Sequence, residues 1–195
     1  MKSINFLIVG VGGQGTILVS DILSEVGMFS GLDAKKSDVM GLAIRGGSVL
    51  SHVRWAEKVG SPMNMTGTVD YLMASEPMEA MRAVEFMKKS STIIYNTYRL
   101  QPMLVSTGQA EYPSEEVVNS TLKSCSKELF YFDATEKALQ IGNVKTMNIV
   151  LLGALSKLLS EVPAEIFEQA IKKHVSSKLQ DLNIRAFHVG REHIV

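Results

Sequence analysis

The stretch Val9-Gly-Val-Gly-Gly-Gln-Gly-Thr16 separates two different apolar patterns. Residues 4–9 form a run rich in apolar and β-branched side chains, whereas residues 17–26 carry apolar side chains at helical spacing. This order predicts a strand, a tight turn and a helix reaching to about residue 29. The glycines that fit the G-x-G-x-x-G template are Gly10, Gly12 and Gly15.

Two interpretations of this loop stay open. The helix amino terminus offers unpaired N–H groups and a partial positive charge, so the loop can hold a phosphate or another anion. Alternatively, the glycines only make a tight joint between strand and helix. The dinucleotide template also expects an acidic residue about 20 positions further on, but Asp33 comes early and Asp38 late for that role. The candidate ligand-binding residues of the loop are Gly10, Gly12, Gly13, Gln14 and Gly15.

The composition is that of one globular domain, residues 1–195. Hydrophobic residues make up 46% and charged residues 21%, which is enough to build a sizeable core. The formal net charge is +0, and this balance argues against a general nucleic-acid binder, which would carry a basic excess. A nearly neutral surface repels other proteins only weakly, which suits a subunit of a complex.

Cysteine usage and hydropathy limit the kinds of site that the chain can hold. Cys125 is its one cysteine, so a disulfide framework or a cysteine-ligated metal cluster within a single chain is excluded. The histidines lack metal-ligand spacing, and no metal site is expected. The longest strongly apolar stretch, 149–155, is too short to cross a membrane, and the cytoplasm is the expected location.

Strand and helix patterns alternate along the rest of the chain and then become helical only. This order predicts an α/β fold, a Rossmann-like, mostly parallel sheet with helices on both faces and extra C-terminal helices. Further strands are expected at 33–39, 49–55, 69–74, 92–96 and 129–132, and further helices at 76–88, 115–123, 134–141, 145–159, 163–175 and 178–190. Ser75 is the expected cap of the helix that starts at Glu76, and Glu76 and Glu79 are interpreted as partners of that helix's dipole.

A second glycine-rich segment, Gly41-Leu-Ala-Ile-Arg-Gly-Gly-Ser48, carries one arginine. Arg45, Gly46 and Gly47 could hold an anion, because arginine offers a planar fork and the glycines expose backbone N–H groups. The alternative is a turn whose arginine is anchored to a local carboxylate or to a partner subunit. Because residues 42–44 are apolar, we expect something to cover them, and in a subunit the partner would do so.

Several motifs together resemble the gamma-type component of the 2-oxoacid:ferredoxin oxidoreductases, and more narrowly the beta subunits of indolepyruvate oxidoreductases. They cover most of the chain in order, although one departure is visible: Met40 and Ile44 stand where the family often has histidine and glutamine. The matching stretches are Gly10–Thr16, Lys36–Val49 with Ser51–Arg54, Ala74–Ala80, Phe132–Ala134 and Gly142–Leu155.

The resemblance implies a reaction in which a 2-oxoacid, coenzyme A and oxidised ferredoxin give acyl-CoA, carbon dioxide and reduced ferredoxin. It also implies that thiamine diphosphate and [4Fe-4S] clusters are bound by a large alpha subunit, and that this chain has no catalytic residue and no resident cofactor of its own. Gamma subunits that act on pyruvate or 2-oxoglutarate are the alternative within the family. A stand-alone nucleotide-binding domain, or a purely structural subunit with an empty glycine loop, is the alternative from another class.

Overall fold

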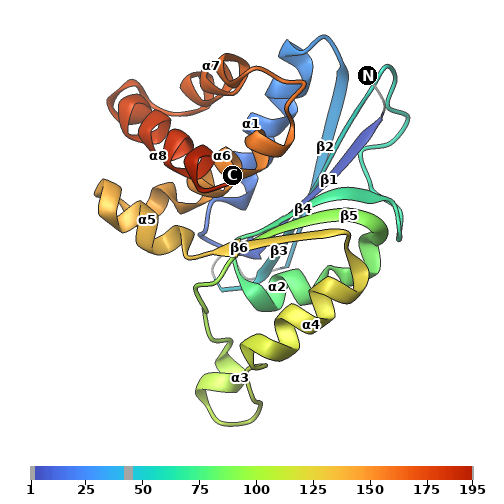
Figure 1. The fold of residues 1–195 in the computed structure, drawn as a ribbon, viewed down its shortest axis with the longest axis vertical. Coiled ribbons are helices and arrows are strands. Elements are labelled where there is room, and N and C mark those ends of the chain that lie inside the picture. Colours follow the sequence, from blue (N-terminus) through green and yellow to red (C-terminus); the bar gives the residue numbers. More distant parts are fainter. Residues whose placement is uncertain (1–2, 42–45, 195) are drawn as a thin grey trace.

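The computed structural model describes residues 3–41 and 46–194 of the chain. These residues form a six-stranded sheet between two layers of helices, with strand order β2-β3-β1-β4-β5-β6 (Figure 1). All pairings are parallel except the two that β3 makes, so the predicted mostly parallel sheet is confirmed. The strands are β1 (Ile4–Val11), β2 (Asp33–Met40), β3 (Ser48–Ala56), β4 (Val69–Ala74), β5 (Met87–Asn96) and β6 (Glu128–Phe132).

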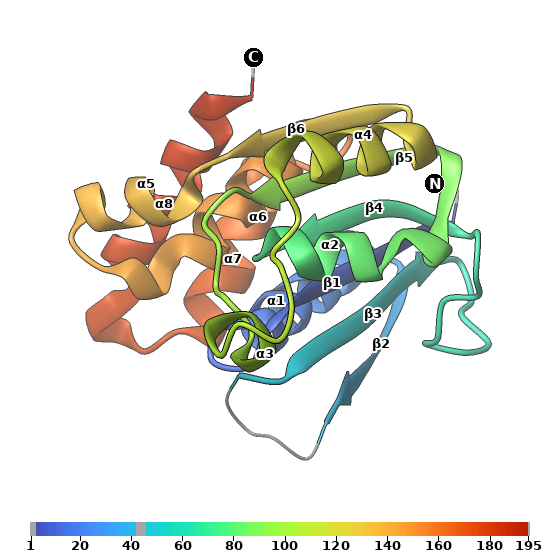
Figure 2. The same ribbon diagram turned by 90° about the horizontal axis from the view of Figure 1, so that it is seen from below.

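Helices cover both faces of the sheet, as the alternating pattern predicted. Figure 2 shows α2 and α4 in front of the sheet and α1 behind it. The first layer contains α2 (Pro77–Arg82) and α4 (Glu115–Cys125), and the second contains α1 (Thr16–Phe29), α5 (Ala134–Ile141), α6 (Met147–Leu158), α7 (Ala164–His174) and α8 (Gln180–His193). The short helix α3 (Met103–Ser106) projects away from both layers, and three 3-10 turns, η1 (Val84–Phe86), η2 (Val144–Thr146) and η3 (Ser177–Leu179), complete the helical elements of the described residues.

The core has two parts because side chains alternate across β1. Phe6 and Ile8 pack with α1 and the C-terminal helices, whereas Leu7 and Val9 pack with α2 and α4. The four side chains are almost fully buried, so β1 is a central strand that contributes to the core on both of its faces.

The C-terminal helix α6 is apolar nearly all round because the sheet covers one side of it and α8 the other. Two glycines let α6 and α8 approach closely. A Cβ on Gly153 would lie 2.0 Å from the Phe187 carbonyl oxygen, and a Cβ on Gly190 would lie 1.8 Å from that of Val150. Each helix therefore contacts the backbone of the other at its glycine.

The predicted helix over 76–88 is wrong at both ends. Glu76 is the N-cap in place of Ser75, the helix ends at Arg82, and β5 begins at Met87 rather than at residue 92. Val84 and Phe86 pack against the core, but they belong to η1 and not to the helix. The next residue, Met87, pairs with Val69 of β4 and so belongs to the sheet. A local periodicity cannot reveal this pairing, because its partner lies on another strand.

No helix among the described residues is long and apolar enough to cross a membrane.

Candidate functional site

The glycine loop joins β1 to α1, as the sequence predicted. β1 ends at Val11 and α1 begins at Thr16, with Gly15 as the N-cap. Gly13 has a φ of 104° and Gly15 a φ of 80°, so the left-handed conformation falls on these two glycines and not on Gly12. An alanine at Gly12 would therefore not be strained by a positive φ.

Two of the loop glycines, Gly10 and Gly15, are packed against the chain, whereas Gly13 is open. A Cβ on Gly10 would lie 2.8 Å from Thr16 Oγ1, and one on Gly15 would lie 2.2 Å from Asn148 Nδ2. A Cβ on Gly13 would have no heavy atom within 4 Å among the described residues outside its own neighbours. Gly10 and Gly15 thus serve the tight joint, whereas Gly13 leaves the backbone open to a ligand or a partner.

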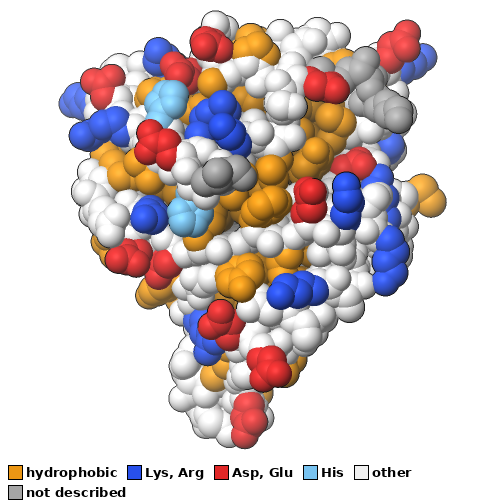
Figure 3. All heavy atoms as spheres, viewed as in Figure 1, with side chains coloured by type: hydrophobic (Ala, Val, Ile, Leu, Met, Phe, Trp, Pro, Cys, Tyr) orange, Lys and Arg blue, Asp and Glu red, His pale blue; other side chains and the backbone are white. Residues whose placement is uncertain are grey.

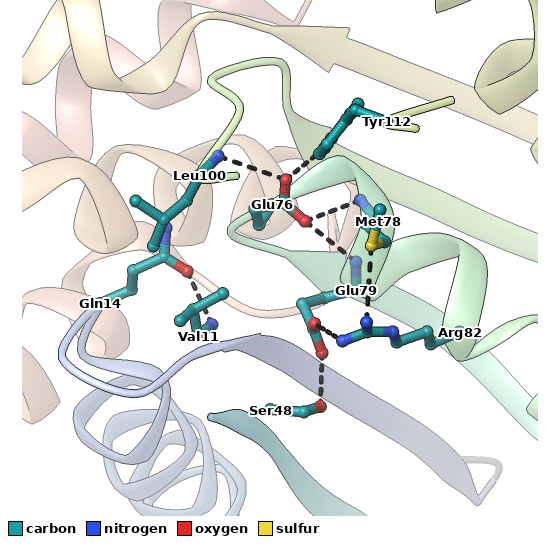
Figure 4. Close-up of polar contacts among 9 residues, drawn as sticks. All are labelled: Val11, Gln14, Ser48, Glu76, Met78, Glu79, Arg82, Leu100 and Tyr112. Carbon is teal, nitrogen blue, oxygen red and sulfur yellow. Dashed lines mark hydrogen bonds and ion pairs between the residues drawn. The ribbon is translucent and has the colours of Figure 1, made fainter. Parts of the chain in front are cut away.

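Gln14 closes the turn with its own side chain. Its Oε1 accepts a hydrogen bond from the Val11 N–H at 2.8 Å (Figure 4). Its Nε2 donates to the Ser75 carbonyl at 3.4 Å. Gln14 therefore ties the glycine loop to the end of β4. The sequence placed Gln14 in the loop, but these partners became visible only in the fold.

The two glycine-rich segments lie side by side. The Gly12 N–H donates to the Gly47 carbonyl at 2.8 Å, and the Gly46 N–H donates to the Gly12 carbonyl at 3.3 Å. This exchange extends the pairing of β1 with β3 beyond the strand ends. Arg45 and the apolar residues 42–44, which the sequence singled out, lie outside the described residues.

These segments stand at the carboxyl edge of the parallel strands, where the connections diverge. From β1 the chain continues into α1 on one face of the sheet, and from β4 it continues into α2 on the other face. Ligands of open α/β sheets bind at such a divergence, and here the Gln14 side chain spans the two strand ends.

Three pockets border the glycine loop. The helix pocket, about 440 Å³, lies between the loop and α6; the arm pocket, about 580 Å³, lies between Gly46–Gly47 and α3; and the edge pocket, about 350 Å³, lies beside the end of β2. Lys145 lines the helix pocket and Arg82 the arm pocket, and sequence reasoning overlooked both cations. Leu100 borders both the helix pocket and the arm pocket, so the segment after β5 separates them.

Large apolar side chains are exposed around these pockets. Met103 is 81% and Leu104 58% exposed at the projecting α3. We call the exposed set at this edge the carboxyl-edge patch: Ile17, Met40, Tyr98, Leu100, Met103, Leu104 and Val144. Hydrophobic side chains also gather over β6 on the face seen in Figure 3. An apolar rim around glycine-rich backbone is typical of a surface that another molecule covers.

Two buried glutamates line the arm pocket and form hydrogen bonds with the segments around it (Figure 4). Glu76 is 1% exposed, and its carboxylate accepts from the Met78 and Glu79 N–H groups, the Leu100 N–H and the Tyr112 hydroxyl. Glu79 is 3% exposed and joins Arg82 to Ser48, the first residue of β3. Glu79 does lie in the first turn of α2, but the long-range partners of the two carboxylates could not be predicted from the sequence.

Several other titratable side chains have structural partners within the fold. His52 is buried, its Nδ1 accepts from the Asn64 N–H at 3.3 Å, and burial lowers its pKa. Asp33 accepts from the Val59 N–H at 2.7 Å, and Asp38 accepts from Ser51 Oγ at 2.6 Å and from Lys36 Nζ at 2.8 Å. Both aspartates, the only acids near the expected ribose position, are thus engaged elsewhere. Burial raises the pKa of Cys125, which keeps its thiol protonated.

Comparison with known proteins decides the family of this fold. Residues 5–193 match the family model described as pyruvate ferredoxin/flavodoxin oxidoreductase. The chain belongs to this family. Within it, the chain is a gamma-type component of the 2-oxoacid:ferredoxin oxidoreductases, and the resemblance noted from the motifs is confirmed.

Two relatives and one solved structure are similar to this chain over nearly its whole length. Indolepyruvate oxidoreductase subunit IorB of Pyrococcus horikoshii is 34% identical, over 97% of this chain and 95% of the relative. The common gamma subunit of the pyruvate/ketoisovalerate oxidoreductases of Pyrococcus furiosus is 28% identical, over 91% and 89%. The crystal structure of pyruvate oxidoreductase subunit PORC from Thermotoga maritima superposes with a TM-score of 0.73 at 22% identity, over 99% and 97%, which shows the same fold.

Proposed function

We propose that the chain is the small subunit of an oxidoreductase that converts indolepyruvate or another arylpyruvate, coenzyme A and oxidised ferredoxin into acyl-CoA, carbon dioxide and reduced ferredoxin. The 34% identity to an indolepyruvate oxidoreductase subunit supports this substrate class. The observation that carries the proposal at the level of the site is the carboxyl edge, where two paired glycine-rich segments are surrounded by exposed apolar side chains.

The redox cofactors fit a partner and not this chain. A [4Fe-4S] cluster is held by four cysteine thiolates, whereas this chain has the single Cys125. The proposed partner is a large alpha subunit that carries the clusters and thiamine diphosphate, which acts as an electron sink when it is bound there. Ferredoxin meets the complex through that partner. The chain functions in the cytoplasm in this proposal.

The carboxyl edge is proposed to meet the large subunit and to border coenzyme A, which is bound as a substrate. Gly13 and Gly46 leave open space beside their backbones, Lys145 supplies a cation near the amino end of α1, and Arg45 is the proposed fork for a phosphate or a partner carboxylate. The proposed binding set is Gly10, Gly12, Gly13, Gln14, Gly15, Arg45, Gly46 and Gly47, in which Gly10, Gly15 and Gln14 act by shaping the loop.

Affinity purification of the tagged chain from its native host tests the assembly. We expect a large, cysteine-rich, thiamine-dependent polypeptide to copurify, and the complex to reduce ferredoxin with indolepyruvate and coenzyme A. The isolated chain should reduce neither ferredoxin nor viologen. Activity of the isolated chain, or its purification without such a partner, would contradict the proposal. Preference for pyruvate or 2-oxoglutarate would instead assign the chain to another branch of the family.

Arg45→Ala separates the roles of the second glycine-rich segment. Removal of one partner from a buried charged hydrogen-bonded pair typically weakens binding by about 2–5 kcal/mol, so we expect weaker assembly, a higher KM for coenzyme A, or both. Arg185→Ala, at an exposed position of α8, is the matched control and should behave as wild type. Wild-type assembly and wild-type coenzyme A kinetics in Arg45→Ala would remove both roles from this arginine.

Calorimetry of the isolated chain tests the alternative from another class. A stand-alone nucleotide-binding domain would bind NAD(H), NADP(H) or FAD without any partner. We expect no such binding, because Asp33 and Asp38 are engaged within the fold and no ribose-binding acid stands at the expected position.

A further inference from the structure

Residues 97–112 form an arm that leaves the sheet at the end of β5 and returns to α4, and α3 lies near its tip (Figure 1). The hydrogen bonds from the Ser106 N–H to the Pro102 carbonyl and from the Thr107 N–H to the Met103 carbonyl, both within the arm, hold the turn of α3 together. Met103 and Leu104 at this turn are largely exposed. The tip is thus locally folded, and its position over the sheet edge depends on how the base of the arm is attached.

One buried carboxylate attaches both sides of that base. Glu76 Oε1 accepts a hydrogen bond from the Leu100 N–H at 3.3 Å and another from the Tyr112 hydroxyl (Figure 4). Its other oxygen accepts from the Met78 N–H at 2.7 Å and the Glu79 N–H at 3.1 Å, and so caps α2. Glu76 therefore links the start of the arm, the end of the arm and a helix fixed on the sheet.

A second contact also joins the start of the arm to its end. The guanidinium carbon of Arg99 lies 5.3 Å from the centre of the Tyr112 ring, within the range of a cation–π interaction. Burial and the neighbouring Glu76 raise the pKa of Tyr112, so its hydroxyl stays protonated and donates at neutral pH. Residues 99, 100 and 112 are thereby held together around one side chain.

The attached arm forms one wall of the arm pocket. Gln101, Pro102, Met103 and Ser106 of the arm line this pocket, and Gly46 and Gly47 lie among the residues that line it from the rest of the fold. A displacement of the arm would change the width of the pocket and would also move Leu100, which borders the helix pocket.

We propose that Glu76 and Tyr112 form a clasp that presets the arm, and with it the wall of the arm pocket, before the chain meets coenzyme A and the large subunit. Both residues are positioning residues in this role. The inference rests on the proposed function, because it assigns to the clasp a purpose in binding at the carboxyl edge. A clasp of this kind improves binding by reducing the conformational freedom that is lost when the complex forms.

Tyr112→Phe tests the clasp, because it removes one hydroxyl and leaves the Glu76 cap of α2 intact. Tyr131→Phe, at an exposed position of β6, is the control. In the isolated full chain we expect amide hydrogen exchange of residues 101–111 to become about tenfold faster in Tyr112→Phe, since a hydrogen bond to a charged group is lost, and to stay unchanged in Tyr131→Phe. Glu76→Gln, which cannot accept all four hydrogen bonds, should loosen the same residues.

Kinetics of the reconstituted complex then test the purpose of the clasp. Tyr112→Phe should raise the KM for coenzyme A or weaken assembly about tenfold, with kcat changed less than about twofold. Unchanged exchange in Tyr112→Phe and Glu76→Gln would overturn the clasp itself. Faster exchange with wild-type KM and wild-type assembly would overturn its positioning role. Failure of the wild-type chain to assemble with a large subunit would overturn the proposed function, while the exchange result would still decide whether the clasp exists.

Discussion

Gly15 combines a left-handed backbone conformation, which disfavours a side chain, with a lack of space for one. Its φ is 80°, and a Cβ would lie 2.2 Å from Asn148 Nδ2, whose hydrogen bond to the Gly15 carbonyl measures 3.0 Å. We expect Gly15→Ala to lower the free energy of unfolding by roughly 1–3 kcal/mol, measured by urea denaturation. Gly31→Ala is the matched control, because Gly31 has a φ of 78° but open space around its Cβ position. A loss in Gly15→Ala no larger than in Gly31→Ala would contradict the packing role.

His52 predicts a pH dependence of stability. Because burial lowers its pKa, the unfolded chain binds a proton at a pH where the folded chain does not, and stability falls as the pH drops below the ordinary value of 6.5. The lowered pKa of His193 acts in the same direction. The paired carboxylates Glu25 and Asp38 have lowered pKa values, so their contributions are lost only at more acidic pH.

The free energy of unfolding, measured by urea denaturation at pH 7.5 and 5.5, checks this prediction. We expect the wild-type chain to be less stable at the lower pH, and His52→Gln to show a smaller difference between the two values. An undiminished difference in His52→Gln would show that His52 is not the responsible group.

At the scale of elements, the contact between α6 and α8 tolerates no side chain at its two glycines. A Cβ on Gly190 would meet the Val150 carbonyl oxygen at 1.8 Å, so the helices would have to separate. Gly190→Ala should reduce the free energy of unfolding by about 1–3 kcal/mol or more, as overpacking does in other cores. Gly60→Ala, where the Cβ position is open, should change stability little. Equal stabilities of the two variants would contradict the close backbone contact.

The sequence predicted most elements because their signals are local. The run at residues 4–9, the loop glycines and the apolar spacing of residues 17–26 identify β1 and α1 without any tertiary information. The end of α2 and the start of β5 could not be predicted in this way, because the pairing of Met87 with Val69 competes with a helical pattern and depends on a strand far away in the sequence.

The candidate site was predictable only in part, for the same reason. Both glycine-rich segments could be recognised from composition, but their mutual pairing depends on β1 lying next to β3. Glu76 looked like a helix-dipole partner, whereas its links to Leu100 and Tyr112 depend on the path of residues 97–112, which carry no periodic pattern. Long-range hydrogen bonds of single side chains leave no local signal in a sequence.

At the scale of the whole molecule, the two edges of the sheet have different surroundings. The carboxyl edge carries both glycine-rich segments, three pockets and the carboxyl-edge patch. The opposite edge carries the loop between β3 and β4, which Asn64 attaches through its bonds to His52 and to the Phe6 carbonyl. A pocket of about 430 Å³ beside Ile4 and Tyr71 also lies at the opposite edge, so the paired glycine-rich segments are the basis for placing the partner and coenzyme A at the carboxyl edge.

Two methionines, one at each edge, permit the most direct test of that placement. Met103 is 81% exposed on α3 and Met65 is 74% exposed on the β3–β4 loop, so a charge at either position should leave the fold intact. The measurement is the affinity of Met103→Asp and of Met65→Asp for the purified large subunit. We expect Met103→Asp to bind at least about tenfold more weakly than wild type, because a buried apolar contact becomes an unpaired charge, and Met65→Asp to bind as wild type does. Wild-type affinity of Met103→Asp, or a loss confined to Met65→Asp, would contradict the assignment of the carboxyl edge as the assembly surface.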